Sequence, residues 1–358
     1  MGIEISKDGK RSSGLKDLNQ FLLLLVLVFV VMHYAQDFLI PVAISGLVAM
    51  MLVPVCRVLE RWNIHRGIAA GICVLITLLV ILGVVYILIN EVIGLSKGIA
   101  VIGNRLNLLL ESTYNFILEH FQYPIDKQRE YLQKQISGLS ESSAKYVGGI
   151  FVSILGGLAK LLIMTTYTVL FLIYRSRIKR FVLMLVVRYS GRKDLEEAKT
   201  VVEKITGVAS SYLSGVFLVV LILSIVYTIG LFIIGVENAL FFGLLAALIN
   251  IIPYIGSVGG AIIVVIYTLI TRDTLTTPIV VAVFFTAIQQ IDSYFLTPKI
   301  TGGMVQLSPL FTIMALLLGA MVWGLAGMIM FIPLLGVLKV IFDHVEELKP
   351  YGYLIGDK

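Results

Sequence analysis

The stretch INIIPYIGSVGG, residues 249–260, interrupts a long apolar run with residues that disfavour a helix. No charged residue occurs between Glu237 and Arg272. About 20 residues of α-helix, each rising 1.5 Å, cross the hydrocarbon core of a membrane, so this run is too long for one ordinary span. Pro253 lacks a backbone donor, and the glycines that follow it give up chain entropy in a helix. The run is therefore predicted to break near its centre.

The composition indicates a membrane protein. Hydrophobic residues make up 58% of the 358 residues, charged residues make up 14%, and the mean hydropathy is +0.98. A soluble domain has about 25% charged residues. We predict an all-α polytopic membrane protein with about eight hydrophobic segments. The uncharged or nearly uncharged runs are 18–36, 38–56, 67–90, 146–174, 205–236, 238–271, 274–291 and 300–338.

Basic residues in the short loops predict the orientation of these segments. Lys and Arg are concentrated in the N-terminal tail, in loop 57–66 and in segment 175–204, whereas connections 33–37 and 235–238 contain none. Cytoplasmic loops are enriched in Lys and Arg, so we expect both termini in the cytoplasm. The basic residues that give the chain its net charge of +6 lie mainly in these loops and tails, where they are explained by orientation in the membrane. No nucleic-acid partner is therefore expected.

The chain divides into regions by hydropathy and charge. Residues 91–145 repeat apolar side chains every three or four positions, as an amphipathic helix does. The predicted regions are a cytoplasmic tail (1–17), three transmembrane helices (18–90), an extracytoplasmic amphipathic helical region (91–145), a fourth transmembrane helix (146–174), a basic cytoplasmic helical segment (175–204), a transport core (205–342) and a cytoplasmic tail (343–358).

The eighth hydrophobic segment is also too long for one span and contains helix breakers. Run 300–338 is uncharged, and Gly319, Gly324, Gly327 and Pro333 interrupt its middle. Both overlong runs, 238–271 and 300–338, either turn back as re-entrant hairpins or cross fully as tilted spans. Non-helical backbone at membrane depth is tolerated where it is buried in protein or lines a watery cavity. Paired Gly/Pro-broken segments point to a transporter binding site.

The candidate site residues lie at these breaks and in the span between them. A carboxylate inside a membrane is costly and typically marks an ion or proton pathway, which singles out Asp292. The alternative is a charge at the membrane edge, paired with Lys299. We expect Asn250, Pro253, Tyr254, Gly256, Ser257, Gly259, Gly260, Gln289, Gln290 and Trp323 to bind solute, and Asp292 and Lys299 to couple an ion or proton. The expected hinges are Gly302, Gly303, Gly319, Gly324, Gly327 and Pro333.

Four stretches of the chain resemble the autoinducer-2 exporter (AI-2E) family of bacterial transporters. These are LIPVAISGLVAMMLVPVCRVLERW (39–62), PYIGSVGG (253–260), QQIDSYFLTPKITGG (289–303) and LSPLFTIMALLLGAMVWGLAGMIMFIPLLGVLKV (307–340). The resemblance covers nearly the whole chain and is strongest from 238 to 340. One departure is Ser214-Gly215-Val216, where the family often carries a basic residue and Gln around a glycine.

The resemblance implies a multi-span permease of the bacterial inner membrane. It also implies a homo-oligomer, such as a ring of five, that exports small polar signals like the quorum-sensing molecule autoinducer-2. Some family members are assigned sodium (or lithium)/proton antiport, so the resemblance leaves the substrate open. Small polar solutes, protons or sodium, and the lipid bilayer are the expected partners.

Three hypotheses about function remain open from the sequence. The first is a secondary transporter that exports a small polar metabolite by alternating access, and the second is a cation/proton antiporter that works through Asp292. The third is an assembly or scaffold protein without transport. The sequence contains no metal-binding HExxH, no phosphate-binding GxxxxGK[ST] and no nucleophile-elbow GxSxG motif. We therefore predict no enzyme activity, no cofactor and no metal site.

Overall fold

The described part of the molecule is built from helices. The computed structural model describes residues 8–92, 126–189, 195–253, 255–272, 274–300, 307–345 and 348–357. Its elements are α1 (Asp8–Tyr34), α2 (Gln36–Arg61), the helix Arg66–Val92, α4 (Asp126–Tyr189), α5 (Leu195–Ile234), α6 (Ala239–Ile249), α7 (Ile255–Thr271), α8 (Thr276–Ile291), the π-helix η1 (Asp292–Leu296), α9 (Thr297–Ile300), α10 (Pro309–His344) and α11 (Lys349–Ile355). Within these ranges six helices are long and apolar enough to cross a membrane, which confirms the predicted all-α polytopic membrane fold.

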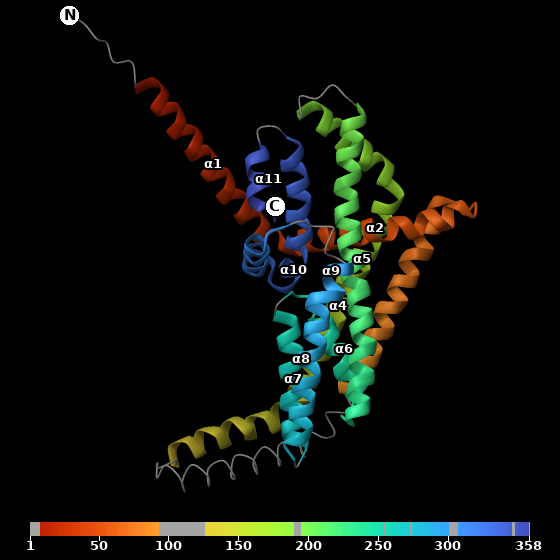
Figure 1. Cartoon of the computed structure of the whole chain (residues 1–358), viewed down its shortest axis with the longest axis vertical. Helices are drawn as coiled ribbons and strands as arrows, with labels where there is room; N and C mark the ends of the chain where they lie inside the picture. Colours follow the sequence, from red (N-terminus) through yellow and green to blue (C-terminus); the bar gives the residue numbers. More distant parts are fainter. Residues whose placement is uncertain are drawn as a thin grey trace, which may run out of the picture.

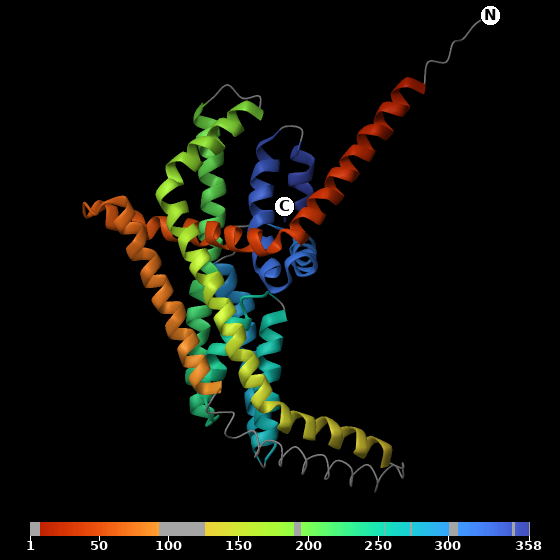
Figure 2. The ribbon, with the colours of Figure 1, turned by 180° about the vertical axis from the view of Figure 1, so that it is seen from behind.

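The helices form a bundle along the long axis of the molecule (Figure 1). Helices α5, α7 and α8 lie roughly along this axis, α2 runs across it, and α1 projects away from the body, as the view from behind also shows (Figure 2). Helix α4 continues unbroken from 126 to 189, across the boundaries predicted at 145 and 174. Most of the amphipathic region predicted at 91–145 lies outside the described residues, which begin again at 126.

The first overlong run is broken at the stretch that the sequence singles out. Helix α6 ends at Ile249 and α7 begins at Ile255, on either side of Pro253. A Cβ on Gly256 would overlap the carbonyl oxygen of Ile249, and one on Gly260 would lie 2.9 Å from the Cα of Ala246. The two helices therefore pack back to back around the break. Helix α6, with 11 residues, rises only about 16 Å, which is too short to cross alone.

The second overlong run also reverses direction, within α10. Trp323 and Gly324 have non-helical backbone dihedral angles. Gly324 has φ 58° and ψ −134°, a backbone conformation that residues with a Cβ rarely adopt. The backbones of Gly319 and Gly327 are in direct contact across this turn, because a Cβ on either would overlap the carbonyl of the other. Pro333 is buried within the arm that follows. Of the four predicted breakers, Gly324 makes the turn and the other two glycines allow the arms to meet.

The main hydrophobic core joins α5, α6, α7 and α8. Tyr227 of α5 is 1% exposed, and its ring lies 4.7 Å from that of Phe285 on α8. Phe242 of α6 packs on Tyr267 of α7 with ring centroids 4.3 Å apart. Buried residues of all four helices belong to one hydrophobic cluster, which packs the broken α6–α7 pair together with α5 and α8.

A second junction joins α2, the 66–92 helix and α4 at their basic ends. Glu60 of α2 forms an ion pair with Arg175 of α4, and both side chains are mostly buried, at 25% and 19% exposure. Arg66 donates from Nε (3.3 Å) and Nη2 (3.2 Å) to the carbonyl of Leu172, and from Nη1 to Ser176. The three helices are therefore joined at this end by charged hydrogen bonds rather than by apolar packing alone.

Replacing Arg175 by Met is expected to lower the free energy of unfolding by roughly 2–3 kcal/mol. Breaking a fully buried ion pair costs roughly 3–5 kcal/mol, and this pair is partly exposed, so its loss should cost less. The loss arises because Glu60 keeps a mostly buried charge without its partner. Thermal unfolding in detergent would measure the change, with the exposed Arg180→Met as the matched control. Adding Glu60→Gln to Arg175→Met should restore part of the stability. Equal melting temperatures for Arg175→Met and Arg180→Met would contradict the assignment.

Candidate functional site

A cavity of about 370 Å³ lies between the two broken segments. Four parts of the chain contribute to its wall: α5, the α6–α7 break with the start of α7, the α8–η1–α9 segment, and α10 with Leu307 just before it. The lining residues are Tyr212, Val216, Val219, Val220, Asn250, Ile251, Pro253, Ser257, Gln289, Asp292, Ser293, Thr297, Leu307, Thr312 and Ile332. The wall is therefore mixed, with apolar side chains mainly from α5 and polar side chains mainly from the α8–η1–α9 segment.

Asp292 is the charged centre of this cavity. It is 5% exposed, and both of its carboxylate oxygens accept hydrogen bonds. Asn250 Nδ2 donates to Oδ2 at 3.2 Å, and Thr297 Oγ1 donates to Oδ1 at 2.8 Å. A buried charge is costly unless polar partners replace water, and here the two partners are neutral. The structure therefore holds Asp292 inside the protein with an amide and a hydroxyl, rather than with a cation.

A π-helical turn places Thr297 beside Asp292. The backbone N–H of Thr297 donates to the carbonyl of Asp292, five residues back, as π-helical geometry requires. In a regular α-helix these two residues would lie roughly 140° apart around the axis. The wider π turn brings them onto one side, so the Thr297 hydroxyl reaches the carboxylate. π-helical turns inside α-helices occur frequently at functional sites.

Gln289 adds an unsatisfied acceptor to the cavity wall. Its Nε2 donates to Ser293 Oγ at 3.2 Å, whereas its Oε1 is buried without a hydrogen-bond partner among the described residues. Buried polar atoms nearly always have a partner, so an unpaired acceptor in a cavity wall indicates a position where a bound donor fits. No Lys, Arg or His occurs among the described residues that line the cavity.

The backbone at the first break satisfies its own donors. Ile251 N–H donates to Leu248 O at 3.2 Å, and Ile252 N–H donates to Ile249 O at 3.1 Å, in short 3₁₀-type bonds. Backbone groups freed at such a break could serve as ligands for a solute. In the structure these N–H groups are occupied, and the side chains of Asn250 and Ser257 supply the polar surface instead.

The structure brings five of the predicted solute and ion residues to the cavity: Asn250, Pro253, Ser257, Gln289 and Asp292. Gly256 and Gly260 lie at the close contact between α6 and α7, and Gly259 faces Ile249 at an ordinary distance. Gln290 and Lys299 are exposed and do not line the cavity. Trp323 donates from Nε1 to the carbonyl of Met32 on α1, at 2.9 Å, and so stabilises the α10 turn. Tyr254, Gly302 and Gly303 lie outside the described residues.

Sequence reasoning missed four polar residues of the cavity, namely Tyr212, Ser293, Thr297 and Thr312. Ser293 and Thr297 follow Asp292 closely, and hydroxyl residues beside an intramembrane carboxylate are a usable signal. The π turn itself has no such signal, because the sequence around it reads as ordinary helix. Tyr212 and Thr312 reach the cavity only through the packing of α5 and α10.

Comparison with known proteins agrees with this architecture. The sequence profile of the AI-2E family transporters matches residues 22–347. The chain is 26% identical over 322 residues to YrrI of Bacillus subtilis, covering 87% of each chain. It is 24% identical over 339 residues to YhhT of Escherichia coli, covering 93% of this chain and 92% of that one. Both relatives are named as candidate transport proteins. A polytopic helical fold, two broken segments and a family profile across most of the chain lead to one conclusion: this protein belongs to the AI-2E family of membrane transporters.

Proposed function

We propose that this transporter exports a small, neutral, polyhydroxylated solute, such as autoinducer-2, by exposing its cavity alternately to the two sides of the membrane. The observation that carries the proposal is the buried Asp292 carboxylate, held by neutral donors inside a cavity of about 370 Å³. This volume lies within the roughly 300–1,000 Å³ of sites for small molecules. A solute with several hydroxyl groups can both donate and accept at such a wall.

The charge of the cavity supports a neutral solute over an anionic one. Asp292 is the only carboxylate among the described lining residues, and no cationic side chain offsets it there. A phosphorylated or carboxylated solute would meet like charge in a site of low dielectric, where repulsion is strong. A neutral solute can donate hydroxyls to Gln289 Oε1 and to Asp292 without that penalty.

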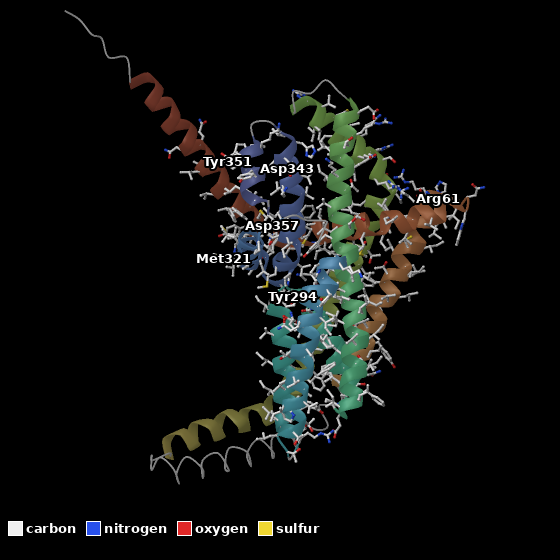
Figure 3. The ribbon with its side chains drawn as sticks, in the orientation of Figure 1. Arg61, Tyr294, Met321, Asp343, Tyr351 and Asp357 are labelled. Carbon is white, nitrogen blue, oxygen red and sulfur yellow. The ribbon has the colours of Figure 1, made fainter. Side chains whose placement is uncertain are left out.

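We also propose a placement of these elements in the membrane. We place both broken segments as re-entrant hairpins, because the arms of each pack back to back around its turn. The Arg-rich ends of α2 and α4 would face the cytoplasm of a bacterial inner membrane, with both termini on that side. Figure 3 shows Tyr294 of η1 near the middle of the long axis, and we propose that this level corresponds to the bilayer midplane, where transporter sites typically lie. We further propose a homo-oligomer, which mass measurement in mild detergent would test.

Counterflow in proteoliposomes tests the proposed solute. Vesicles loaded with unlabelled autoinducer-2 should take up the labelled molecule with saturation, and a neutral sugar of similar size should compete. A phosphorylated analogue should compete at least tenfold less, because Asp292 repels it. Empty vesicles processed in parallel provide the control. Uptake that does not saturate, or equal competition by the phosphorylated analogue, would overturn the proposal.

A second candidate function is sodium(lithium)/proton antiport, and the burial of Asp292 favours it. A carboxylate at 5% exposure with neutral partners can exchange a proton for a cation, since either neutralises its charge. A pH-sensitive dye inside the vesicles would report proton efflux on addition of sodium. Sodium-dependent proton flux without counterflow would favour this candidate over the exporter.

A further inference from the structure

A second, smaller cavity lies among α2, the 66–92 helix and α4. Its volume is about 110 Å³, and it is distinct from the cavity around Asp292. The lining residues are mostly aliphatic, with Leu52 of α2, Leu78 of the 66–92 helix and Met164 of α4 as examples. Ile81 at its edge is 40% exposed, so the cavity borders on the outer surface of the bundle.

The polar groups in this second cavity are already satisfied. Ser45 Oγ bonds to the carbonyls of Pro41 (2.6 Å) and Met164 (2.9 Å). The hydroxyls of Thr77, Thr165 and Thr168 each donate to the carbonyl four residues earlier in their own helix. The wall therefore offers no unmet hydrogen bond to a polar solute. Apolar cavities of about 150 Å³ stay dry and accept a hydrocarbon such as benzene, so this one fits a few methylene groups.

The same three helices end in a basic and aromatic surface. The Glu60–Arg175 pair and the Arg66 hydrogen bonds join them there. Arg61, Arg177 and Arg180 are exposed near this junction, and the guanidinium of Arg177 lies over the ring of Tyr174, 5.4 Å from its centroid. Figure 3 shows Arg61 at the outer end of α2. The neighbouring Trp62 is 71% exposed, and exposed Trp beside Arg is typical of the membrane interface.

The spacing between this surface and the cavity matches the depth of a lipid. Thr168 of the cavity precedes Arg177 by nine residues, which is roughly 14 Å of helix, and precedes Arg180 by twelve, roughly 18 Å. Each interfacial region of a bilayer is about 5–8 Å thick, so the cavity lies at the depth of acyl chains when the arginines lie at the phosphates.

We propose that α2, the 66–92 helix and α4 form a binding site for one anionic phospholipid. One acyl chain enters the apolar cavity, and the phosphate lies against Arg61, Arg177 and Arg180. Guanidinium groups hold phosphate through paired hydrogen bonds and charge attraction. In a zwitterionic lipid the cation of the headgroup repels the arginines, so an anionic lipid should bind more tightly. The site is separate from the solute cavity, so it does not depend on the proposed transport function.

Thermal unfolding of the full-length protein in mild detergent tests the headgroup contacts. Added phosphatidylglycerol should raise the melting temperature in a saturable way, and phosphatidylcholine should raise it far less. The double variant Arg61→Gln/Arg177→Gln should weaken the apparent affinity for phosphatidylglycerol at least tenfold. The control variant Lys299→Gln/Lys349→Gln removes two exposed cations elsewhere and should leave that affinity unchanged. Equal weakening in both double variants would show charge screening alone and overturn the proposal.

A matched pair of substitutions tests the acyl-chain contact. Leu78→Phe fills the cavity, whereas Leu79→Phe places the same ring on a side chain that is 59% exposed. Leu78→Phe should weaken phosphatidylglycerol binding severalfold, and Leu79→Phe should not. Wild-type affinity in Leu78→Phe would overturn the acyl-chain assignment. If Leu78→Phe does not fold, the surface arginine variants still decide whether the anionic lipid binds here.

Discussion

Replacing Gly327 by Ala is expected to destabilise the protein by about 3 kcal/mol or more, and to disrupt the hairpin in α10. A Cβ at this position would overlap the carbonyl carbon and oxygen of Gly319. Overpacking of a well-packed site usually costs about 1–3 kcal/mol, and the upper end applies when no side chain can rotate away. Here the obstructing atoms are backbone, so the two arms must separate. The same result is expected for Gly319→Ala, because the overlap is reciprocal.

Tryptophan fluorescence during thermal unfolding measures this effect directly. The chain has two Trp residues, and Trp323 lies at the α10 turn with its Nε1 bonded to Met32 O. In a Trp62→Phe background, Gly327→Ala should lower the melting temperature and shift the Trp323 emission. Gly83→Ala in the 66–92 helix is the control, because no atom lies within 4 Å of its added Cβ. It should be neutral or gain up to about 1 kcal/mol of helix propensity. Equal destabilisation by both substitutions would contradict the contact between Gly319 and Gly327.

The positions of both breaks could be predicted because breakers act locally. Pro253 removes a backbone donor and is followed closely by three glycines, and the helix boundaries at Ile249 and Ile255 lie on either side of it. In the second run the sequence identified four breakers but not their separate roles. Gly324 adopts the positive φ of the turn, whereas Gly319 and Gly327 are needed for close approach. That distinction depends on which arm packs on which, and a single sequence does not contain it.

The chemistry of the site was predicted only in part, for a related reason. Asp292 and Asn250 were each expected from residue type and context, but their hydrogen bond joins positions 42 residues apart. Lys299 was the alternative partner because it is near in sequence, yet it is exposed and does not line the cavity. The π turn at 292–296 changes which residues share a face, so the five-residue spacing to Thr297 appeared uninformative. Local rules locate breaks and charges, and tertiary packing selects their partners.

Asp292→Asn is expected to abolish accumulation of solute against its gradient while leaving counterflow exchange measurable. The carboxylate accepts from both Asn250 Nδ2 and Thr297 Oγ1, and it is the only carboxylate in the described wall of the cavity. An amide can accept at one oxygen only, and its NH₂ group would face either the Thr297 hydroxyl, which can accept, or the Asn250 NH₂ group, which cannot. The amide also cannot bind or release a proton, so any coupling through this position is lost.

Two measurements on the same proteoliposomes separate these roles. Counterflow of labelled autoinducer-2 should persist in Asp292→Asn with a half-saturation concentration about tenfold higher, equivalent to about 1.4 kcal/mol of lost binding. Uptake driven by an imposed proton gradient should fall to background. Asp37→Asn is the matched control, since Asp37 is an acid whose side chain is 85% exposed and pairs with Lys160. It should support both activities.

Each outcome of this comparison assigns a different role to the carboxylate. Undiminished gradient-driven uptake in Asp292→Asn would exclude Asp292 from coupling and leave it a structural acceptor for Asn250 and Thr297. Loss of counterflow as well, with the melting temperature and oligomer mass unchanged, would place Asp292 in direct contact with the solute. If wild-type protein shows sodium-dependent proton flux that Asp292→Asn lacks, and no counterflow in either form, antiport replaces export as the function. The hydrogen bonds in the structure favour loss of accumulation with counterflow retained, because they hold Asp292 inside the cavity through two neutral side chains, Asn250 at the α6–α7 break and Thr297 after the π turn.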